Sequence, residues 1–398
     1  EVREEKYQIS DTVIYISAIA GGLILAFSET YWFQSTAVEV YSLNIMLMLA
    51  VIYFLFKAFI NEDKSFKDSL KYWMFFSFFL ALGFSNHMTT LLVLPGVAYL
   101  YFNKYGFKGE SFKRLVIMIS FFFVILFLFY SYLPLRASQN PYLNWGNPVD
   151  WERIWRHISG QQYQVWLFSS TEAAKKQLTY FIDSLPGEFT VTLFLSLAGL
   201  IFSFIKAKKL FYFLLISFFF TILYSINYDI SDIDAYFLLA YTSLSFFAVL
   251  GSVQIFNLLK SKSGVIAVPV FLIALFIGIQ IYINYDKVDQ SEQWTYEDYT
   301  LAIMEYTDEN GLLFSYQWDY FLSATYYYQF VEGIRKDIAV IDKELLRRSW
   351  YYHQLETCYP GIFDGIKDDV NLFLEALKLF ERKERYNPNL LEIRFRAI

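Results

Sequence analysis

The sequence predicts an α-helical polytopic membrane protein followed by an α/β domain outside the membrane. Of its 398 residues, 56% are hydrophobic and only 18% are charged, a composition too apolar for a soluble globular protein. Long apolar runs recur along the first 283 residues, whereas the composition after residue 284 is that of an ordinary soluble protein. We therefore expect a transmembrane domain over 1–283, with 134–186 as its longest outer loop, and an extracytoplasmic α/β domain over 284–398 that is truncated.

The apolar runs set the number of membrane helices. A bilayer core of roughly 30 Å requires about 20 apolar residues per helix, and by that rule the chain contains about nine transmembrane helices. Their predicted ranges are 11–27, 38–57, 71–84, 89–103, 113–133, 187–205, 210–227, 236–259 and 265–283.

The basic residues of the short loops predict which loops lie outside, because cytoplasmic loops carry an excess of lysine and arginine. Basic residues gather in alternate loops, namely at Lys57, Lys64, Lys67 and Lys71, at Lys104, Lys108, Lys113 and Arg114, at Lys206, Lys208 and Lys209, and at Lys260 and Lys262. The intervening loops 28–39, 85–90 and 228–234 contain neither lysine nor arginine. They are predicted to lie outside, together with 134–186 and the C-terminal domain.

The C-terminal domain begins with a βαβ pattern. Residues 311–316 and 337–342 are predicted strands, and residues 319–331 between them are a predicted amphipathic helix. A further helix is expected over 368–385.

Several classes of function are excluded by composition and motifs. The net charge of −6 and the lack of a basic tract argue against a nucleic-acid partner. The single cysteine, Cys358, excludes an intramolecular disulfide, and the three histidines form no HExxH motif, so no metal site is predicted. Neither a Walker motif nor GxGxxG occurs. Because the chain starts at Glu1 without a signal peptide, we expect a missing upstream part.

The predicted outer face carries unusual polar residues. Pro134 ends a membrane helix and Arg136 follows it, and Asn147 with Pro148 is expected to start a surface helix. In that helix Trp151, Ile154, Trp155 and Ile158 lie on one side, and Arg153, Arg156 and His157 lie on the other. The basic side suits an anionic lipid headgroup, while an interfacial anchor without a ligand remains the alternative.

Carboxylates and a histidine occupy the other outer loops. Glu39, at the start of an apolar helix, suits either a base that takes a proton from a hydroxyl or a structural ion pair. Asn86 and His87 suit a helix-end cap or a ligand contact. Asp229, Asp232 and Asp234 cluster in loop 228–234 and favour turn and cap roles over a direct role in binding. Glu29 flanks the first outer loop with Glu39, and a carboxylate at the end of a membrane helix requires a function or a partner.

These residues also carry a resemblance. Four blocks occur in one order, FSETYWFQSTAVEVYSLN (27–44), GFSNHMTTLLVLPG (83–96), YLPLRASQNPYLNWGNPVDWERIWRHISGQQY (132–163) and YDISDIDAYFLLAY (228–241). Together they resemble the bacterial branch of the transmembrane protein O-mannosyltransferase-like family, long described as a domain of unknown function. Residues 331–355 resemble the segment that follows the membrane part of bacterial members.

The resemblance implies the GT-C glycosyltransferase fold and a pocket for a lipid phosphate and a sugar. The residues that match the family's blocks are Glu39, Asn86, His87, Arg136, Asn140, Trp145, His157 and Tyr163. The usual GT-C catalytic carboxylate lies in the first outer loop, which would precede Glu1, so Glu39 is expected to be a supporting residue.

The function expected from this resemblance is transfer of a hexose, with mannose favoured, from a polyprenyl-phosphate donor to Ser/Thr hydroxyls of exported proteins. No cofactor is expected besides that donor substrate. The expected partners are the lipid bilayer, the lipid-linked sugar and the exported acceptor protein. The expected location is the bacterial inner membrane, with the active face and C-terminal domain in the periplasm. The alternatives are a transporter or flippase of lipid-linked sugars and an inactive membrane scaffold.

Overall fold

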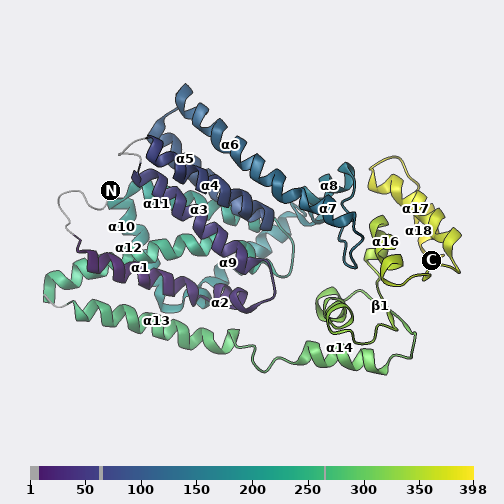
Figure 1. The fold of residues 1–398 in the computed structure, drawn as a ribbon. Helices are drawn as coiled ribbons and strands as arrows, with labels where there is room; N and C mark the ends of the chain where they lie inside the picture. The colour runs from purple at the N-terminus through teal and green to yellow at the C-terminus, as the bar shows by residue number, and fades with distance from the viewer. Residues whose placement is uncertain (1–8, 62–65, 264–265) are drawn as a thin grey trace. The chain divides into compact units, whose positions relative to one another are not determined.

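The computed structural model describes residues 9–61, 66–263 and 266–398 and divides the chain into two compact units (Figure 1). The first unit comprises Glu1–Tyr130 and Tyr163–Asp289, and the second comprises Ser131–Gln162 and Gln290–Ile398. Glu1 and Lys64, which the sequence analysis used, lie outside the described residues.

This division differs in two places from the expected domains. Helix α13 (Ala267–Val288) continues through a polar last turn, so the first unit ends at Asp289 rather than at 283. The segment Ser131–Gln162 was expected among the outer loops of the membrane domain, and it belongs instead to the second unit. The reason is packing: Trp145 of this segment lies against Trp350, with ring centroids 5.1 Å apart.

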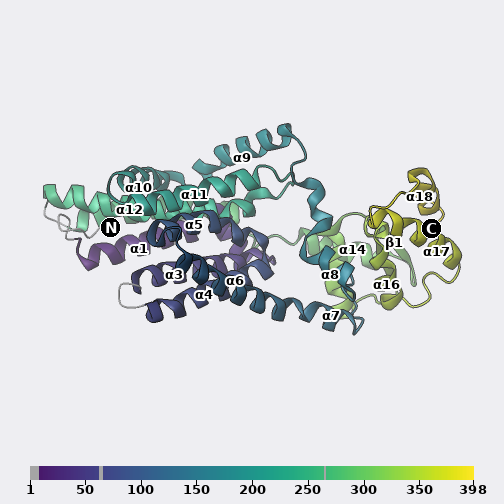
Figure 2. The ribbon, with the colours of Figure 1, turned by 90° about the horizontal axis from the view of Figure 1, so that it is seen from above.

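The first unit is a bundle of helices. Besides α13 its helices are α1 (Asp11–Ala26), α2 (Glu29–Thr36), α3 (Tyr41–Asn61), α4 (Phe66–Asn86), α5 (Leu94–Tyr105), α6 (Gly109–Tyr130), α9 (Thr171–Phe189), α10 (Leu193–Lys206), α11 (Lys208–Ser225) and α12 (Leu238–Ser263). Short 3₁₀ turns precede α5, α10 and α12, namely η1 (Met88–Val93), η3 (Thr190–Thr192) and η4 (Ile233–Phe237). Helices α3, α4 and α6 lie side by side, as do α10, α11 and α12 (Figure 2).

Six helical spans of the described chain are long and apolar enough to cross a membrane, which is consistent with the predicted helical membrane protein. They are Tyr41–Asn61, Gly109–Ala137, Thr171–Lys206, Lys208–Ser225, Ile233–Leu259 and Ala267–Val288. The pair α1 and α2, bent by 68°, makes a seventh if it is one span. The expected number of about nine is not confirmed. The predicted span 89–103 is divided between η1 and the 12-residue α5, which is too short for a bilayer core.

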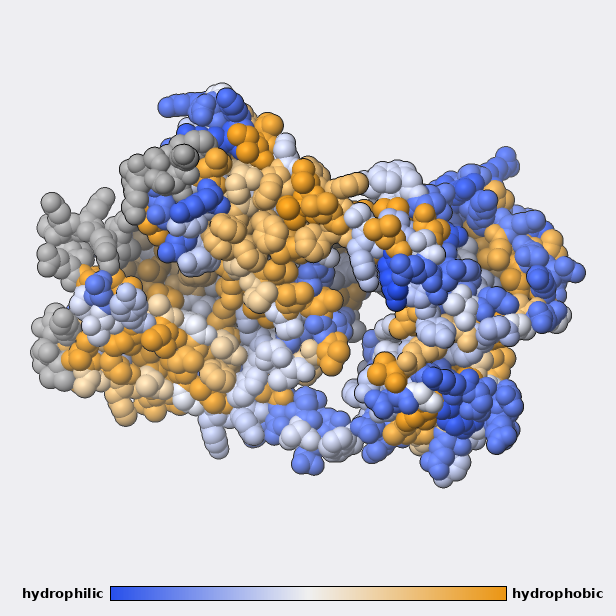
Figure 3. Space-filling view, in the orientation of Figure 1, coloured by the Kyte–Doolittle hydropathy of each residue, from blue (hydrophilic) through white to orange (hydrophobic). Residues whose placement is uncertain are grey.

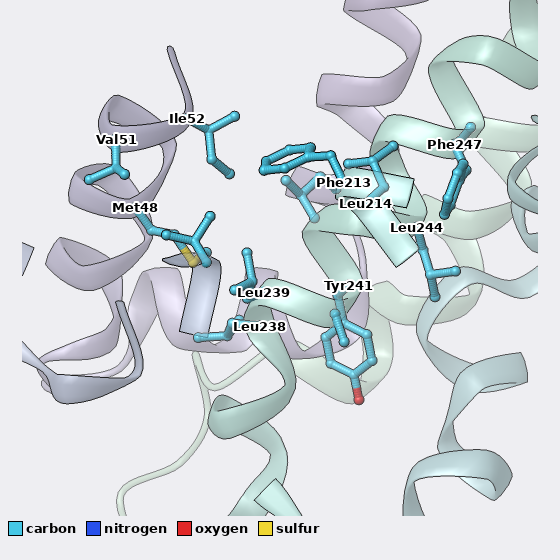
Figure 4. Close-up of a cluster of buried hydrophobic side chains, with 14 of the residues drawn as sticks. Met48, Val51, Ile52, Phe213, Leu214, Leu238, Leu239, Tyr241, Leu244 and Phe247 are labelled. Carbon is cyan, nitrogen blue, oxygen red and sulfur yellow. The ribbon is translucent and has the colours of Figure 1, made fainter. Parts of the chain in front are cut away.

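The core of the first unit is aliphatic and aromatic. Leu238, Leu239 and Leu244 of α12 share one cluster of buried side chains with Phe213 and Leu214 of α11 and with Met48 of α3 (Figure 4). On the face shown in Figure 3, the surface of this unit is also largely hydrophobic, whereas hydrophilic residues dominate the surface of the second unit. An apolar core inside an apolar surface is expected for a bundle that lipid surrounds.

Helices α10 and α12 approach each other closely because glycines lie at their crossing. A Cβ atom at Gly199 would overlap the carbonyl oxygen of Phe247, and a Cβ atom at Gly251 would overlap that of Leu195. Small residues of this kind allow two membrane helices to pack backbone against backbone.

The second unit confirms the predicted βαβ pattern. Strands β1 (Leu312–Ser315) and β2 (Ala339–Asp342) pair in parallel, with Leu312 opposite Ala339. The predicted helix between them consists of η5 (Trp318–Leu322), α15 (Ser323–Tyr327) and η6 (Tyr328–Glu332). The remaining helices of the unit are α7 (Tyr132–Ala137), α8 (Trp151–Ile158), α14 (Thr295–Tyr306), η7 (Leu345–Arg347), α16 (Ser349–Cys358), α17 (Lys367–Glu381) and α18 (Pro388–Phe395).

Candidate functional site

Three loops that lack lysine and arginine meet at one end of the first unit. Asn86 of loop 85–90 donates a hydrogen bond from Nδ2 to the carbonyl oxygen of Val40, the residue directly after loop 28–39, at 3.0 Å. Loop 228–234 leads into η4, where Tyr236 lies 5.3 Å from the ring of His87. We call this region, together with the ends of α9 and α13 that contact it, the polar end. The contacts confirm that these loops share one end of the bundle, as their composition predicts.

Glu188 is the most deeply buried carboxylate of the polar end, with 3% of its surface exposed. It lies one residue before the end of α9, and it accepts two hydrogen bonds from Thr30 of α2. One comes from the Thr30 amide at 3.0 Å and the other from the Thr30 hydroxyl. Asn284 of α13 donates to the main-chain oxygens of Glu188 and Phe27, at 3.2 and 3.0 Å. Glu188 and Asn284 therefore hold the start of α2 against α9 and α13.

An ion pair lies next to this contact. Lys287 Nζ of α13 is 2.5 Å from Oε2 of Glu29, the first residue of α2. A Cβ atom at Gly187 would lie 3.3 Å from both partners, so glycine leaves room for the pair. Asp234 of η4 accepts a hydrogen bond from the hydroxyl of Tyr180 in α9. The polar end thus holds three carboxylates, Glu29, Glu188 and Asp234, of which Glu29 pairs with Lys287.

The local sequence explains why the chain turns at these positions. Ser28 has an extended backbone at the N-cap of α2, and its hydroxyl donates to the Leu25 carbonyl oxygen at 2.9 Å. This serine links α1 to α2 across their 68° bend. In α9, Pro186 lies inside the last turn, and Thr190 has a φ of 45°, which ends the helix directly after Glu188.

His87 lies among aromatic rings. Its ring centroid is 5.2 Å from that of Tyr41 and 5.3 Å from that of Tyr236, and Tyr228 lies 5.0 Å from Tyr236. Nδ1 of His87 accepts from the Thr89 amide at 3.4 Å and caps η1, which confirms the predicted helix-end cap. Burial lowers the pKa of His87 to about 4, so the imidazole is neutral at pH 7.

The loop before α12 connects the carboxylates with these rings. Asp234 contacts Tyr180 beside the ion pair, and Tyr236, two residues later, contacts Tyr41 and His87. Glu39 lies at the same end, in the turn before α3, and its side chain is exposed.

The residues predicted to bind substrate are divided between the two units. Glu39, Asn86, His87 and Tyr163 belong to the first unit, and Arg136, Asn140, Trp145 and His157 belong to the second. Tyr163 is exposed and lies 6.1 Å from the ring of Trp166. The structure therefore brings Glu39, Asn86 and His87 to one end of the bundle, and a ligand role for each of them stays a prediction.

In the second unit, the block after α6 packs on the C-terminal part of the chain. Trp145 lies between Trp318 and Trp350, with centroid distances of 5.2 and 5.1 Å. Asn140 Oδ1 is 2.9 Å from Nε2 of His353. Trp145 thus has a packing role in this unit that the sequence did not indicate.

Two predicted donor-binding residues of this block, Arg136 and His157, are both exposed. Arg136 is exposed and donates to Gln139 Oε1 at 2.7 Å, and His157 is exposed in the last turn of α8. Helix α8 starts at Trp151, with the Asp150 carboxylate as its N-cap, rather than at the expected Asn147 and Pro148. The reason is that Asn147 has a φ of 41° and belongs to the preceding turn.

Sequence reasoning missed Glu188 and Lys287. Glu188 is a charged residue at the start of the predicted span 187–205, directly after Pro186 and Gly187. A carboxylate in an apolar run is a signal that the sequence does contain. Lys287 lies four residues beyond the predicted end of the last span, where charged residues are common. Within the described part of the chain, no three His, Cys, Asp or Glu side chains are grouped as metal ligands.

Comparisons with known proteins bear on the family. A profile described as the Protein O-mannosyl-transferase TMEM260 N-terminal domain matches residues 2–110. The Protein O-mannosyl-transferase TMEM260 of Mus musculus is 23% identical over 370 residues, which cover 86% of this chain and 52% of the mouse protein. The Protein O-mannosyl-transferase tmem260 of Dictyostelium discoideum is 24% identical over 400 residues, which cover 88% of this chain and 48% of that protein.

This chain thus spans about half the length of the curated relatives it matches. No solved structure matches it significantly. The profile and the two relatives confirm the resemblance predicted from the sequence, and they relate this chain to the O-mannosyltransferase-like family.

Proposed function

We propose that this chain is part of an integral membrane glycosyltransferase of the GT-C type. It transfers a hexose from a polyprenyl-phosphate donor to serine or threonine hydroxyls of exported proteins. The observation that carries the proposal is the alignment of 86% and 88% of the chain with proteins named protein O-mannosyl-transferase, and for the same reason mannose is the favoured sugar.

The polar end supports this proposal chemically. In the reaction, the acceptor hydroxyl oxygen bonds to the anomeric carbon, and the bond from that carbon to the lipid phosphate oxygen breaks. A carboxylate takes the hydroxyl proton, and a cation stabilises the departing phosphate. A single displacement of this kind inverts the anomeric configuration. The polar end offers carboxylates at Glu29 and Asp234 and a cation at Lys287.

The contacts suggest different roles for the carboxylates. Glu188 is buried and hydrogen-bonded to Thr30, so we assign it to positioning α2 rather than to proton transfer. Glu39 is exposed at the start of α3 and is proposed as a supporting residue. Aromatic rings around His87 offer flat apolar faces for a pyranose ring.

The second unit is proposed to act on the same side of the membrane. Its residues Arg136, Asn140 and His157 are the proposed contacts to the donor, because guanidinium and imidazole groups bind phosphate oxygens. The proposed location is the bacterial inner membrane, with the polar end and the second unit facing the periplasm. This sidedness rests on the lysine and arginine residues in the alternate loops.

The test uses the full-length protein in membrane vesicles that contain radiolabelled polyprenyl-phosphate mannose, and it follows label into protein. We expect label in protein, and we expect Arg136→Ala to abolish transfer while the protein stays folded in the membrane. Arg385→Ala is the matched control, since it removes an exposed arginine from the same unit.

Two outcomes contradict the proposal. Unchanged transfer by Arg136→Ala removes this residue from the donor site. Label that crosses the bilayer on lipid without entering protein identifies a transporter of lipid-linked sugars.

A further inference from the structure

Helix α8 has a charged side that is engaged within the second unit. Arg156 Nη1 donates to Glu381 Oε2 at 3.1 Å, and its Nη2 donates to the Glu381 carbonyl oxygen at 2.8 Å and to Glu152 Oε1 at 2.6 Å. The Glu381 carboxylate also accepts from the amide and hydroxyl of Ser349, at 3.0 and 2.7 Å. Arg382 Nη2 lies 3.3 Å from Glu152 Oε2. These bonds fasten α8 to the end of α17 and the start of α16.

The other side of α8 is aromatic and uncovered. Trp151 is 75% exposed and Trp155 is 59% exposed, and they lie four residues apart, hence on the same side of the helix. No residue of α8 is buried. The charged side of α8 holds the helix in place, and Trp151 and Trp155 on the other side form an exposed surface that is free to dock.

The position of α8 in the chain indicates what covers this surface. The candidate membrane span Gly109–Ala137 ends before α8, and the candidate span Thr171–Lys206 begins after it. Only residues 138–150 and 159–170 separate α8 from these two spans, so both of its ends are tied close to the bilayer. Tryptophan rings prefer the headgroup level of a membrane, where the ring meets lipid and the indole N–H meets water.

We propose that Trp151 and Trp155 of α8 insert into the lipid–water interface and that the Arg156–Glu381 contact makes α8 the membrane anchor of the second unit. The partner is the lipid surface itself. This inference is independent of the transferase activity proposed above.

The anchor works by apolar insertion rather than by charge. Arg156 is engaged by Glu152 and Glu381, and the Arg153 guanidinium lies 3.7 Å from the Asp150 carboxylate. The sequence alone favoured a basic side that binds anionic headgroups. With these arginines paired inside the protein, contact with the bilayer does not require anionic lipid.

The test places an environment-sensitive fluorophore on α8 of the full-length protein in nanodiscs. Cys358, the only cysteine of this chain, is changed to Ser, and a single cysteine replaces Trp155 and carries the nitrobenzoxadiazole probe. The control probe replaces Glu375, an exposed residue of α17. Phosphatidylcholine with a spin label high on the acyl chain quenches probes at the interface. We expect quenching at position 155 to be severalfold stronger than at position 375, and to be the same with and without phosphatidylglycerol.

Three results would overturn the proposal. Equal quenching at positions 155 and 375 means that α8 does not reach lipid. Quenching that needs phosphatidylglycerol supports the basic-side interpretation instead. A blue-shifted probe at position 155 that lipid spin labels do not quench shows that protein covers this side of α8. Because the probe leaves Arg156 and Glu381 in place, loss of the fold does not confuse these outcomes.

Discussion

Glu188 provides a stringent test of how the polar end is assembled. Its carboxylate accepts both the amide and the hydroxyl hydrogen of Thr30, and it does so with 3% of the residue exposed. In Glu188→Ala both donors lose their acceptor. In Glu188→Gln the amide group keeps one acceptor oxygen but presents an N–H₂ group where the carboxylate presented its second oxygen.

The expected magnitudes follow from the number of donors left unpaired. Each buried donor without a partner costs about 1–3 kcal/mol. Glu188→Ala should therefore destabilise the protein by about 2–6 kcal/mol, and Glu188→Gln by about 1–3 kcal/mol. Thr30→Val removes only the hydroxyl bond, so it should cost about 1 kcal/mol. Transfer activity should decline in the same order, because Glu29 lies at the start of the helix that these bonds hold.

The assay is unfolding of purified protein in mild detergent, followed by tryptophan fluorescence, for the three variants and for Glu172→Gln. Glu172 is an exposed carboxylate on the same helix, and its substitution should change stability by less than about 0.5 kcal/mol. The reasoning fails if Glu188→Ala is no less stable than Glu172→Gln. It also fails if Glu188→Ala and Glu188→Gln lose the same stability and the same activity.

Further predictions concern three other positions. Glu39→Gln should weaken transfer without eliminating it, and complete loss in the vesicle assay would identify Glu39 as the base. Burial lowers the pKa of His87 to about 4, so between about pH 6.5 and pH 4 the unfolded chain binds a proton at this residue and the folded protein does not. As the pH falls through this range, the free energy of unfolding should decrease by about 3 kcal/mol, and by less in His87→Asn. Unfolding measured as a function of pH tests this expectation. Gly199→Ala should lower the free energy of unfolding by more than about 3 kcal/mol or prevent folding. Gly278→Ala should be tolerated, because the added methyl group meets no atom within 4 Å. Equal yields of folded protein from the two variants would contradict this expectation.

Local pattern and charge sufficed for much of the fold. The short apolar runs 311–316 and 337–342 predicted two strands, the first of them buried. The structure pairs the two strands in parallel, with Leu312 and Phe314 of the first strand exposed. The absence of lysine and arginine from three loops predicted a shared end, which the contacts of Asn86 and Tyr236 confirm. The strands depend on residues close in sequence, and the shared end depends on the lysine and arginine content of whole loops. Both features can therefore be predicted from a single sequence.

The features that sequence did not predict depend on distant partners. Trp145 lies between Trp318 and Trp350, which follow it by more than 150 residues, and no local pattern indicates such a contact. The same holds for Arg156, which pairs with Glu381 inside the protein instead of binding a lipid phosphate. Glu188 is visible as a carboxylate at the start of an apolar run, but its partner Thr30 lies 158 residues away, so the sequence does not indicate their contact.

The second unit is assembled from two separate stretches of chain, and this arrangement constrains biogenesis. A ribosome delivers Ser131–Gln162 long before Gln290–Ile398, with most of the first unit's later helices between them. Trp145 and Arg156 therefore lack Trp350 and Glu381, their partners in this unit, until α16 and α17 have been synthesised. A folding factor, or early contact of α8 with lipid, would protect Trp145, Trp151 and Trp155 during that interval. For the same reason the second unit cannot be removed or replaced as one continuous segment, because deleting Gln290–Ile398 alone leaves Ser131–Gln162 without the residues that form its core.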